Sequence, residues 1–325
     1  MKAAVYRRYG GADVVSCQDV PTPVPRDDEV LVRVRAATVG VVDSLARRGA
    51  PFYARAHFGL RRPRFPVLGS DFAGEVAAVG RSVSGFGAGE AVFGTCAPRF
   101  GAHAEYVCLP GDGALAAMPA GVSFAEAAAL VDGTALCFLR DQARLRAGQA
   151  VLVNGASGAV GTAAVQLARY FGATVTGVCS GANGALVRSL GAEAVIDYGQ
   201  ADFARDGRSY DMIFDAAGRS SFLHCRAALR PEGVYLTTAA SLAILLQMGW
   251  TGVFGGRKAV VAFTGLRPAG DKRRDLAFIR ELAEASALAG VVDADYPLAR
   301  IGDAYARVDA GHKKGNVVVT MTGAP

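Results

Sequence analysis

Three glycines spaced three residues apart could bring a backbone turn against an anion. Gly155, Gly158 and Gly161 stand between an apolar run at 149–153 and a run at 162–171 with helical periodicity. Glycine permits a tight turn and a close approach of the backbone, and a helix N-terminus offers unpaired N–H groups with a favourable dipole. The order of strand, glycine turn and helix therefore predicts a site for the pyrophosphate of a dinucleotide. Glycines alone would fit a purely structural turn equally well, and the surrounding alternation favours the binding site.

The residues after the next strand bear on the choice of dinucleotide. An Asp or Glu at the end of that strand would bind the ribose 2′-hydroxyl and repel a 2′-phosphate. The segment 178–183 contains no acid and offers Ser180 and Asn183 as small donors. This pattern favours NADPH, with NADH as the weaker alternative. Arg188 is expected on the following helix, in solvent, so that no basic residue clearly holds the phosphate.

These residues need a scaffold, and the pattern from about residue 122 supplies one. Apolar runs of strand length alternate with helical segments, which is typical of a parallel sheet with helices on both faces. We therefore expect a doubly wound α/β domain. Its expected strands are 149–153, 174–179, 194–197, 210–215, 233–237 and 258–264, and its first helices are 162–171 and 185–190.

The first part of the chain has a different pattern. Residues 1–118 form short β segments interrupted by turn residues, such as 30–36 and 74–80, which predicts an irregular antiparallel domain. After residue 265 the expected elements are helix 271–289, strand 291–298, helix 301–310 and strand 316–321. They do not continue the alternation, so we assign them to the first domain. The predicted domains are 1–120 with 267–325, and 121–266.

Composition excludes several classes of protein. The chain has 325 residues, of which 51% are hydrophobic and 20% charged, and this suits two compact cores. Its charge of +6 is spread along the chain, so the group Arg61, Arg62 and Arg64 reads as a solvated loop, and neither a nucleic-acid nor a membrane partner is expected. The apolar stretch 241–254 reads as a buried helix and loop. Six dispersed cysteines and no signal-peptide pattern at the N-terminus predict a cytoplasmic location.

Several ordered motifs resemble one known family. The motifs are 66–74 (PVLGSDFAG), the glycine turn 154–161, 175–180 (VTGVCS), 190–192 (LGA), 196–198 (IDY) and the tail 311–318 (GHKKGNVV). Together they resemble the quinone oxidoreductase-like branch of the medium-chain dehydrogenase/reductase superfamily. The resemblance runs from residue 1 to about 320. It implies a GroES-like catalytic domain, a Rossmann domain that binds NADPH, hydride transfer to quinones or α,β-unsaturated carbonyls, and often a homodimer paired through an edge strand, here 258–264.

The resemblance also implies a set of cofactor-binding residues. They are the turn and the ends of the following strands, namely Thr134, Gly155, Ala156, Ser157, Gly158, Ala159, Val160, Gly161, Ser180, Asn183, Tyr198, Ala217, Phe263 and Asn316. The chain departs from the family at two of them. Members often carry a basic residue where Asn183 stands and a lysine where Asn316 stands, so the preference for NADPH is expected to be modest.

Zinc-dependent relatives hold their metal with residues that this chain lacks. The position of their cysteine, three residues before Asp43, is Gly40, and their Gly-His-Glu is Gly69-Ser70-Asp71. A catalytic zinc needs three protein ligands and an open position. We therefore expect chemistry without zinc. Cys96, His103 and Cys108 are expected to pack on strands or loops and to bind no metal.

No proton donor is assured, and three residues are catalytic candidates. Tyr53 and Thr134 could donate a hydrogen bond to a developing enolate or phenolate, and Asp43 could brace the neighbouring loop. His57 and Lys313 are weaker candidates. A tyrosine that quinone-reducing relatives carry two residues after the aspartate is Leu45 here, so the substrate does not transfer. The alternatives are an NADPH-binding protein with little catalysis and a biosynthetic enoyl reductase or alcohol dehydrogenase.

Overall fold

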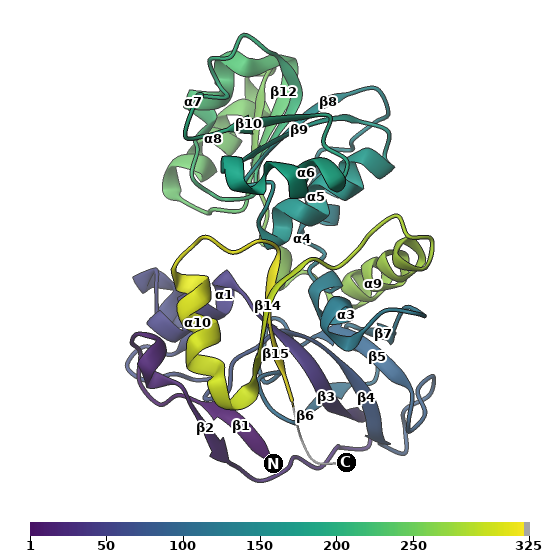
Figure 1. The fold of residues 1–325 in the computed structure, drawn as a ribbon. Helices are drawn as coiled ribbons and strands as arrows, with labels where there is room; N and C mark the ends of the chain where they lie inside the picture. The colour runs from purple at the N-terminus through teal and green to yellow at the C-terminus, as the bar shows by residue number, and fades with distance from the viewer. Residues whose placement is uncertain (322–325) are drawn as a thin grey trace. The chain divides into compact units, whose positions relative to one another are not determined.

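The computed structural model describes residues 1–321 and divides the chain into two compact units (Figure 1). One unit holds Met1–Asp132 together with the segment that begins at Gly265, and the other holds Gly133–Thr264. Each unit has its own sheet and its own buried cluster of side chains. The architecture is α/β, with a GroES-like β domain and a doubly wound Rossmann domain.

The Gly133–Thr264 unit contains a six-stranded parallel sheet in the order β10-β9-β8-β11-β12-β13. Right-handed crossovers put α5 and α6 on one face and α7 and α8 on the other, and Figure 1 draws the two pairs apart. Strand β8 lies inside the sheet, and its Val151, Leu152 and Val153 are fully buried. The strands are β8 (Ala150–Asn154), β9 (Thr174–Cys179), β10 (Ala194–Asp197), β11 (Tyr210–Asp215), β12 (Leu229–Thr237) and β13 (Lys258–Val261). The helices are α4 (Thr134–Leu136), α5 (Ala159–Tyr170), α6 (Gly184–Ser189), α7 (Phe222–Cys225) and α8 (Leu242–Val253).

The other unit is built on a seven-stranded sheet in the order β14-β15-β3-β4-β5-β7, with β6 also paired to β3. Strands β3, β4, β5, β6 and β7 pair in antiparallel fashion, whereas β14 runs parallel to β15. The strands are β3 (Glu29–Val39), β4 (Asp71–Val79), β5 (Ala91–Thr95), β6 (Tyr106–Pro110), β7 (Leu115–Ala117), β14 (Val292–Pro297) and β15 (Asn316–Thr320); β1 (Lys2–Val5) and β2 (Ser16–Asp19) form a separate hairpin. The helices are α1 (Val41–Arg48), α2 (Arg55–Phe58), α3 (Phe124–Leu130), α9 (Ala269–Glu284) and α10 (Ile301–Asp309).

One expectation from the sequence is wrong. The stretch 241–254 was expected to be buried, but α8 buries only Ile244 and Thr251, and Leu242, Trp250 and Phe254 are each about two-thirds or more exposed. A helix that is apolar on every side can bury one face against the sheet, but it has no polar face to present to water. Helix α8 packs on the edge strand β13, so only that face is covered within this chain.

Several boundaries also differ from the expected ranges. Helix α5 begins at Ala159 rather than at residue 162, because the glycine turn closes directly into its first turn. Strand β13 ends at Val261, and a 3₁₀ turn occupies Thr264–Leu266. Strand β12 begins four residues early, at Leu229, and α9 ends at Glu284 rather than at residue 289.

Candidate functional site

The glycine turn is shaped by contacts that exclude side chains at two of its three glycines. Gly155 has φ +81°, and a Cβ there would lie 2.7 Å from the Ala217 Cβ. A Cβ on Gly161 would overlap the carbonyl oxygen of Gly155 and crowd Ala156. Gly158 is different, because its nearest neighbour is the Gly155 oxygen at 3.5 Å. The first and third glycines therefore build the turn, and the second leaves one side of it open.

The start of α5 leaves backbone donors available at this turn. Gly158 occupies the N-cap in extended conformation, and no side chain caps the helix. The first N–H groups of a helix have no partner within the helix, and they carry the positive end of the dipole. An anion that lies against Gly158 would satisfy these donors, so the residues fit the pyrophosphate of a dinucleotide.

Side chains beside the turn add polar groups to the same edge of the sheet. The Asn183 amide donates to Ser157 Oγ at 3.0 Å, and both residues are 9% exposed. Asn154, at the end of β8, donates to Asp215 Oδ1 at 2.8 Å, and Asp215 in turn accepts from Tyr235. This second network fixes the end of β11, because all of its members are buried.

The carboxyl ends of the parallel strands gather most of the residues expected to bind the cofactor. In an open α/β sheet this is the edge at which ligands bind. Ser180 and Asn183 follow β9, Ala217 follows β11, and Tyr198 follows β10 with its N–H bonded to the Cys179 carbonyl. Phe263 follows β13 and is 54% exposed. Thr134 bonds through Oγ1 to Thr264 Oγ1 at 2.9 Å.

The structure brings an acid to the end of β9 that the order of residues along the chain did not reveal. Strands β9 and β10 pair with Cys179 opposite Asp197. A Cβ built on Gly181 would lie 2.6 Å from Asp197 Oδ2, so the carboxylate borders the turn after β9. Its other oxygen accepts from the Gly199 N–H at 2.9 Å. Asp197 is therefore a residue that could discriminate between cofactors, which sequence reasoning missed because it follows a different strand.

Asn316, also expected at the cofactor, belongs to the first unit and is 8% exposed. Its amide nitrogen is 3.3 Å from both the Ala129 and the Val291 carbonyl oxygens. These bonds tie the start of β15 to its neighbours. The amide hydrogens of Asn316 are therefore already engaged within the first unit.

Asp43 is held inside the first unit as a brace between two loops. Its carboxyl oxygens accept from the Gly40 N–H at 2.8 Å and from the Gly69 N–H at 3.1 Å. Burial raises the pKa of Asp43, although the nearby His103 and the backbone donors oppose the shift. The side chain is 2% exposed, so it stabilises the loops at 40 and 69 and offers no accessible proton.

His103 lies in the same buried network as a neutral imidazole. Its Nε2 is 2.9 Å from the Thr38 oxygen, and its Nδ1 is 3.3 Å from the Tyr305 hydroxyl. Donation from Nε2–H to the carbonyl leaves Nδ1 to accept from the hydroxyl. Burial lowers the pKa of His103, so that it is uncharged at neutral pH.

The other proposed proton donors of the first unit differ in their exposure to solvent. Tyr53 lies in the 3₁₀ turn Phe52–Ala54 and is 68% exposed. His57 is also exposed, with Nε2 3.2 Å from the Pro98 oxygen. Burial lowers the pKa of Lys313 to about 8, and its Nζ donates to the Gly315 oxygen at 2.6 Å.

Asp71 is a carboxyl group whose chemistry the sequence did not indicate. It begins β4, directly after Gly69 and Ser70. Burial, followed by the charge of Asp132, raises the pKa of Asp71 to about 7. Lys272 is 8% exposed and bonds through Nζ to the Ala97 and Gly265 oxygens. An acid with this pKa is half-protonated at neutral pH and suits general acid catalysis.

Two of the positions that hold zinc in related enzymes carry neither cysteine nor histidine in this chain. Gly40 caps α1, and Ser70 accepts through its backbone oxygen from the Cys96 N–H. Among residues 1–321, no three His, Cys, Asp or Glu side chains are grouped so that they could hold a metal ion. In the same part of the chain, no helix combines the length and hydrophobicity that crossing a bilayer requires.

The chain matches two family models. Residues 26–132 match the alcohol dehydrogenase GroES-like domain, and residues 190–319 match the zinc-binding dehydrogenase model. The chloroplast envelope quinone oxidoreductase homolog of Arabidopsis thaliana is 31% identical over 98% of both chains. The chain belongs to the medium-chain dehydrogenase/reductase superfamily, in its quinone oxidoreductase-like branch.

Other members of this branch agree in sequence and in fold. An NADPH-dependent alkenal/one oxidoreductase of A. thaliana is 31% identical over 98% of this chain and 79% of its own. The solved structure of a quinone oxidoreductase from Coxiella burnetii superposes with a TM-score of 0.87 at 28% identity, over 99% of both chains. The family and the fold expected from the sequence are thus confirmed. The protein is an oxidoreductase.

Proposed function

We propose that this oxidoreductase uses NADPH to reduce a quinone or an α,β-unsaturated carbonyl by hydride transfer, without zinc. The observation that carries the proposal is the open side of the turn at Gly158, where no side chain caps the start of α5. When bound, the cofactor supplies a hydride to the electrophilic carbon of the acceptor. NADH is the weaker alternative.

The chain's own residues then have distinct roles in binding. The N–H groups at 159–161 hold the pyrophosphate, and Ser157, fixed by Asn183, offers its hydroxyl beside them. Ser180 and Tyr198 bind the adenosine ribose and its phosphate. Ala217 and Phe263, which follow β11 and β13, line the nicotinamide half together with Thr134, the first residue of α4. Asp197 opposes the 2′-phosphate by charge, which makes the preference for NADPH modest.

The Gly133–Thr264 unit is the cofactor-binding domain in this proposal, and the GroES-like unit is the catalytic domain. The reaction product needs a hydrogen bond and a proton after hydride transfer. Tyr53 is exposed and can donate to the substrate, and Asp71 is half-protonated at neutral pH because its pKa is about 7. Water can supply the proton in their place.

Gly40 and Ser70 support the absence of zinc, because they replace two of the three ligands that a catalytic zinc requires. Conjugated acceptors suit a site without a Lewis acid. Proximity and desolvation carry much of the acceleration there. The names of two relatives, a quinone oxidoreductase homolog and an alkenal/one oxidoreductase, denote acceptors of this kind.

We further propose a homodimer formed through β13 and α8. Strand β13 is the edge of its sheet, and an edge strand presents unpaired N–H and C=O groups. The adjoining helix exposes large apolar side chains, which are Leu242, Leu246, Trp250, Val253 and Phe254. A second copy paired in antiparallel fashion at β13 would satisfy both the strand edge and the helix.

We place the protein in the cytoplasm, on the ground of its cysteines. All six are free, and burial raises the pKa of Cys179 and Cys225, so these two are poorly reactive. Several relatives carry chloroplastic or mitochondrial names, so the compartment needs its own test. A fluorescent fusion imaged in the source cells would supply it.

An assay of purified protein tests the activity. NADPH and NADH are each combined with a panel of quinones and enones, and the absorbance of the reduced nicotinamide is followed. We expect turnover with NADPH that survives a chelator, and metal analysis without stoichiometric zinc. Stoichiometric zinc or a clear preference for NADH would overturn those parts of the proposal.

A second candidate function is cofactor binding with little catalysis. The observation that favours it is the bracing of Asp43, both of whose oxygens are taken by backbone donors. Tight NADPH binding without turnover on any acceptor would support this candidate and reject the reductase.

A further inference from the structure

A basic surface on the first unit has no acidic counterpart in its own segment of the chain. Between Asp43 and Asp71 the sequence contains six arginines and no Asp or Glu. Arg47 is buried and bonds to Asp309, and Arg55 is half-buried. The other four, Arg48, Arg61, Arg62 and Arg64, are exposed.

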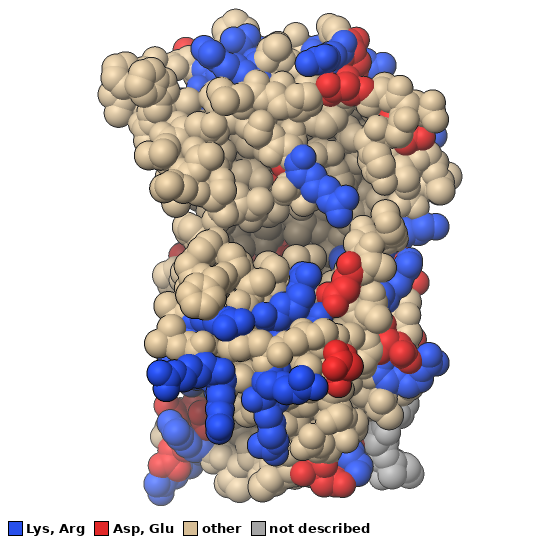
Figure 2. All heavy atoms as spheres, turned by 90° about the vertical axis from the view of Figure 1, so that its left-hand side faces the viewer, with Lys and Arg blue, Asp and Glu red and all other residues tan. Residues whose placement is uncertain are grey.

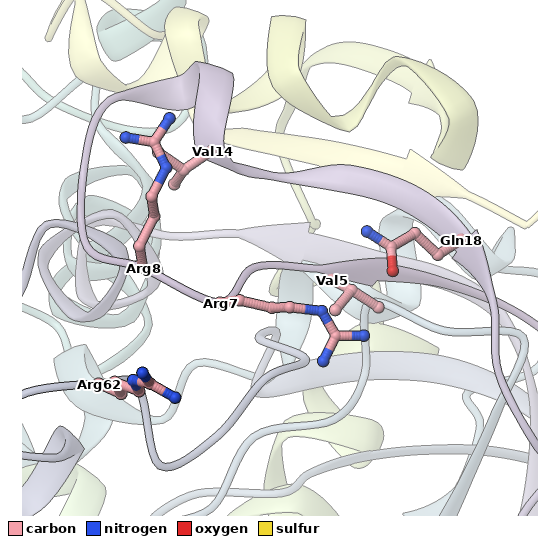
Figure 3. Close-up of a pocket in the computed structure, with 6 residues that line it drawn as sticks. All are labelled: Val5, Arg7, Arg8, Val14, Gln18 and Arg62. Atoms are coloured by element: carbon pink, nitrogen blue, oxygen red, sulfur yellow. The ribbon is translucent and has the colours of Figure 1, made fainter.

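The fold adds two more arginines to this surface. Arg7 and Arg8 follow β1, and they line with Arg62 an open pocket of about 440 Å³ (Figure 3). The remaining lining residues are Val5, Val14 and Gln18, so no acid lines the pocket. Arg8 has one weak partner, Asp13 at 3.7 Å, and both side chains are about three-quarters exposed. Within residues 1–321, Arg7, Arg61 and Arg62 have no ion pair or hydrogen-bond partner.

We call the six exposed arginines the basic face; they are Arg7, Arg8, Arg48, Arg61, Arg62 and Arg64. Figure 2 shows basic side chains gathered over the lower part of the view, with several acidic side chains beside them. The sequence alone suggested a solvated loop, because the group Arg61, Arg62 and Arg64 is short and the charge is spread along the chain. The convergence of Arg7 and Arg62 on one pocket is a property of the fold.

The segment that carries four of these arginines also exposes apolar side chains. Phe52 is 76% exposed and Leu60 is 71% exposed. Contacts with Tyr9 hold the segment 52–60 in place. The Tyr9 hydroxyl donates to the Gly59 oxygen, and the Arg55 guanidinium lies 4.5 Å from the Tyr9 ring centroid. Phe52 and Leu60 therefore extend from a fixed base toward solvent.

This combination of charge and hydrophobicity matches an anionic lipid surface. Arginines near such a surface are attracted to its headgroups, and apolar side chains beside them enter the boundary of the acyl chains. A nucleic acid would stack its bases on open ring faces, but the Arg55 guanidinium lies 5.3 Å from the Phe52 ring centroid and Leu60 has no ring.

We propose that the basic face docks the protein peripherally on bilayers that contain anionic lipids, with the Arg7, Arg8 and Arg62 pocket receiving headgroup phosphates. This departs from the sequence expectation of no membrane partner, and it does not depend on the reductase activity. It requires no membrane-spanning helix, and none is present in residues 1–321.

Co-sedimentation of the full chain with vesicles tests the proposal. Vesicles of phosphatidylcholine alone are compared with vesicles that also contain phosphatidylglycerol, at low and high salt. We expect binding only to the anionic vesicles, and weaker binding at high salt because exposed charges are screened. Failure to bind anionic vesicles at low salt would overturn the proposal.

Two triple variants with equal charge changes locate the surface. Arg61→Gln/Arg62→Gln/Arg64→Gln should weaken binding by roughly a hundredfold, at roughly fivefold for each arginine near the surface. The control Arg205→Gln/Arg226→Gln/Arg273→Gln removes three exposed arginines elsewhere and should change binding by less than about threefold. Equal losses of binding in the two variants would show that binding depends only on the net charge of the protein. That result would reject the basic face as the docking surface.

A third variant tests the apolar contribution. Phe52→Ser/Leu60→Ser retains every charge and should lower the binding that persists at high salt. Circular dichroism melting of each variant separates lost docking from lost folding. Binding of a single-stranded RNA that requires the same three arginines, without binding to vesicles, would contradict the proposal.

Discussion

Replacing Gly158 with aspartate should separate cofactor binding from folding. A Cβ at this position has its nearest neighbour at 3.5 Å, and φ is −81°, so an aspartate fits without strain. Asp is a better N-cap than Gly and interacts favourably with the helix dipole, so the unit should gain about 0.5–1 kcal/mol. The melting temperature should stay the same or rise by a few degrees, on the order of 2–4 °C.

The same carboxylate should prevent the pyrophosphate from binding. Two unit charges about 4 Å apart near a protein surface repel by about 4 kcal/mol, and about 1.4 kcal/mol corresponds to a tenfold change in affinity. Aspartate would also occupy the free N–H groups of α5. After allowance for screening we expect the Kd for NADPH to rise by about 10²–10³-fold.

Titration calorimetry with NADPH and a thermal melt of the same samples measure both effects. Ser241→Asp is the matched control, because Ser241 already caps α8 in the same unit and the added charge lies at a different helix. It should leave NADPH affinity within about twofold. An unchanged Kd for Gly158→Asp would show that the pyrophosphate does not bind at this turn. A large fall in the melting temperature would show that the turn has no room for a side chain at residue 158.

Three further predictions follow from single features. Asp197→Asn should tighten NADPH binding by about fivefold and leave NADH nearly unchanged, and equal effects on both cofactors by calorimetry would show that Asp197 does not face the 2′-phosphate. Burial raises the pKa of Asp71 from 3.8 to about 7, so its contribution to stability is present below pH 3.8 and lost as pH rises to 7. Asp71→Asn should therefore stabilise the protein by about 1–2 kcal/mol at pH 8 in urea unfolding, with a smaller effect near pH 4, and destabilisation at pH 8 would contradict this. Trp250→Glu/Phe254→Glu should convert the dimer into a monomer in light scattering, and a wild-type protein that is itself monomeric would reject the proposed interface.

The sequence predicted the Rossmann strands closely where they are buried. Strands β9, β10 and β11 have the expected bounds, because parallel strands covered on both faces read as continuous apolar runs. The ends of β13 and α9 were misplaced, since exposed ends are set by local hydrogen bonds and not by hydrophobic periodicity.

Two of the features that were missed depend on contacts between separate segments of the chain. Asp197 reaches Gly181 only because β10 pairs with β9 in a particular register. Arg7 joins Arg62 because the end of β1 lies beside the loop before β4. The exposure of α8 could not be predicted either, because an apolar helix has the same sequence pattern whether its cover comes from its own chain or from another.

Transfer of a labelled hydride tests the central claim most directly. NADPH carrying deuterium at the transferred position of C4 is incubated with the protein and an enone that proves to be a substrate, or with the whole acceptor panel if none is known. The account predicts a saturated product with one deuterium at the former β-carbon, formed equally well in the presence of a chelator. Absence of deuterium from every product, or a reaction that stops when zinc is removed, would contradict it.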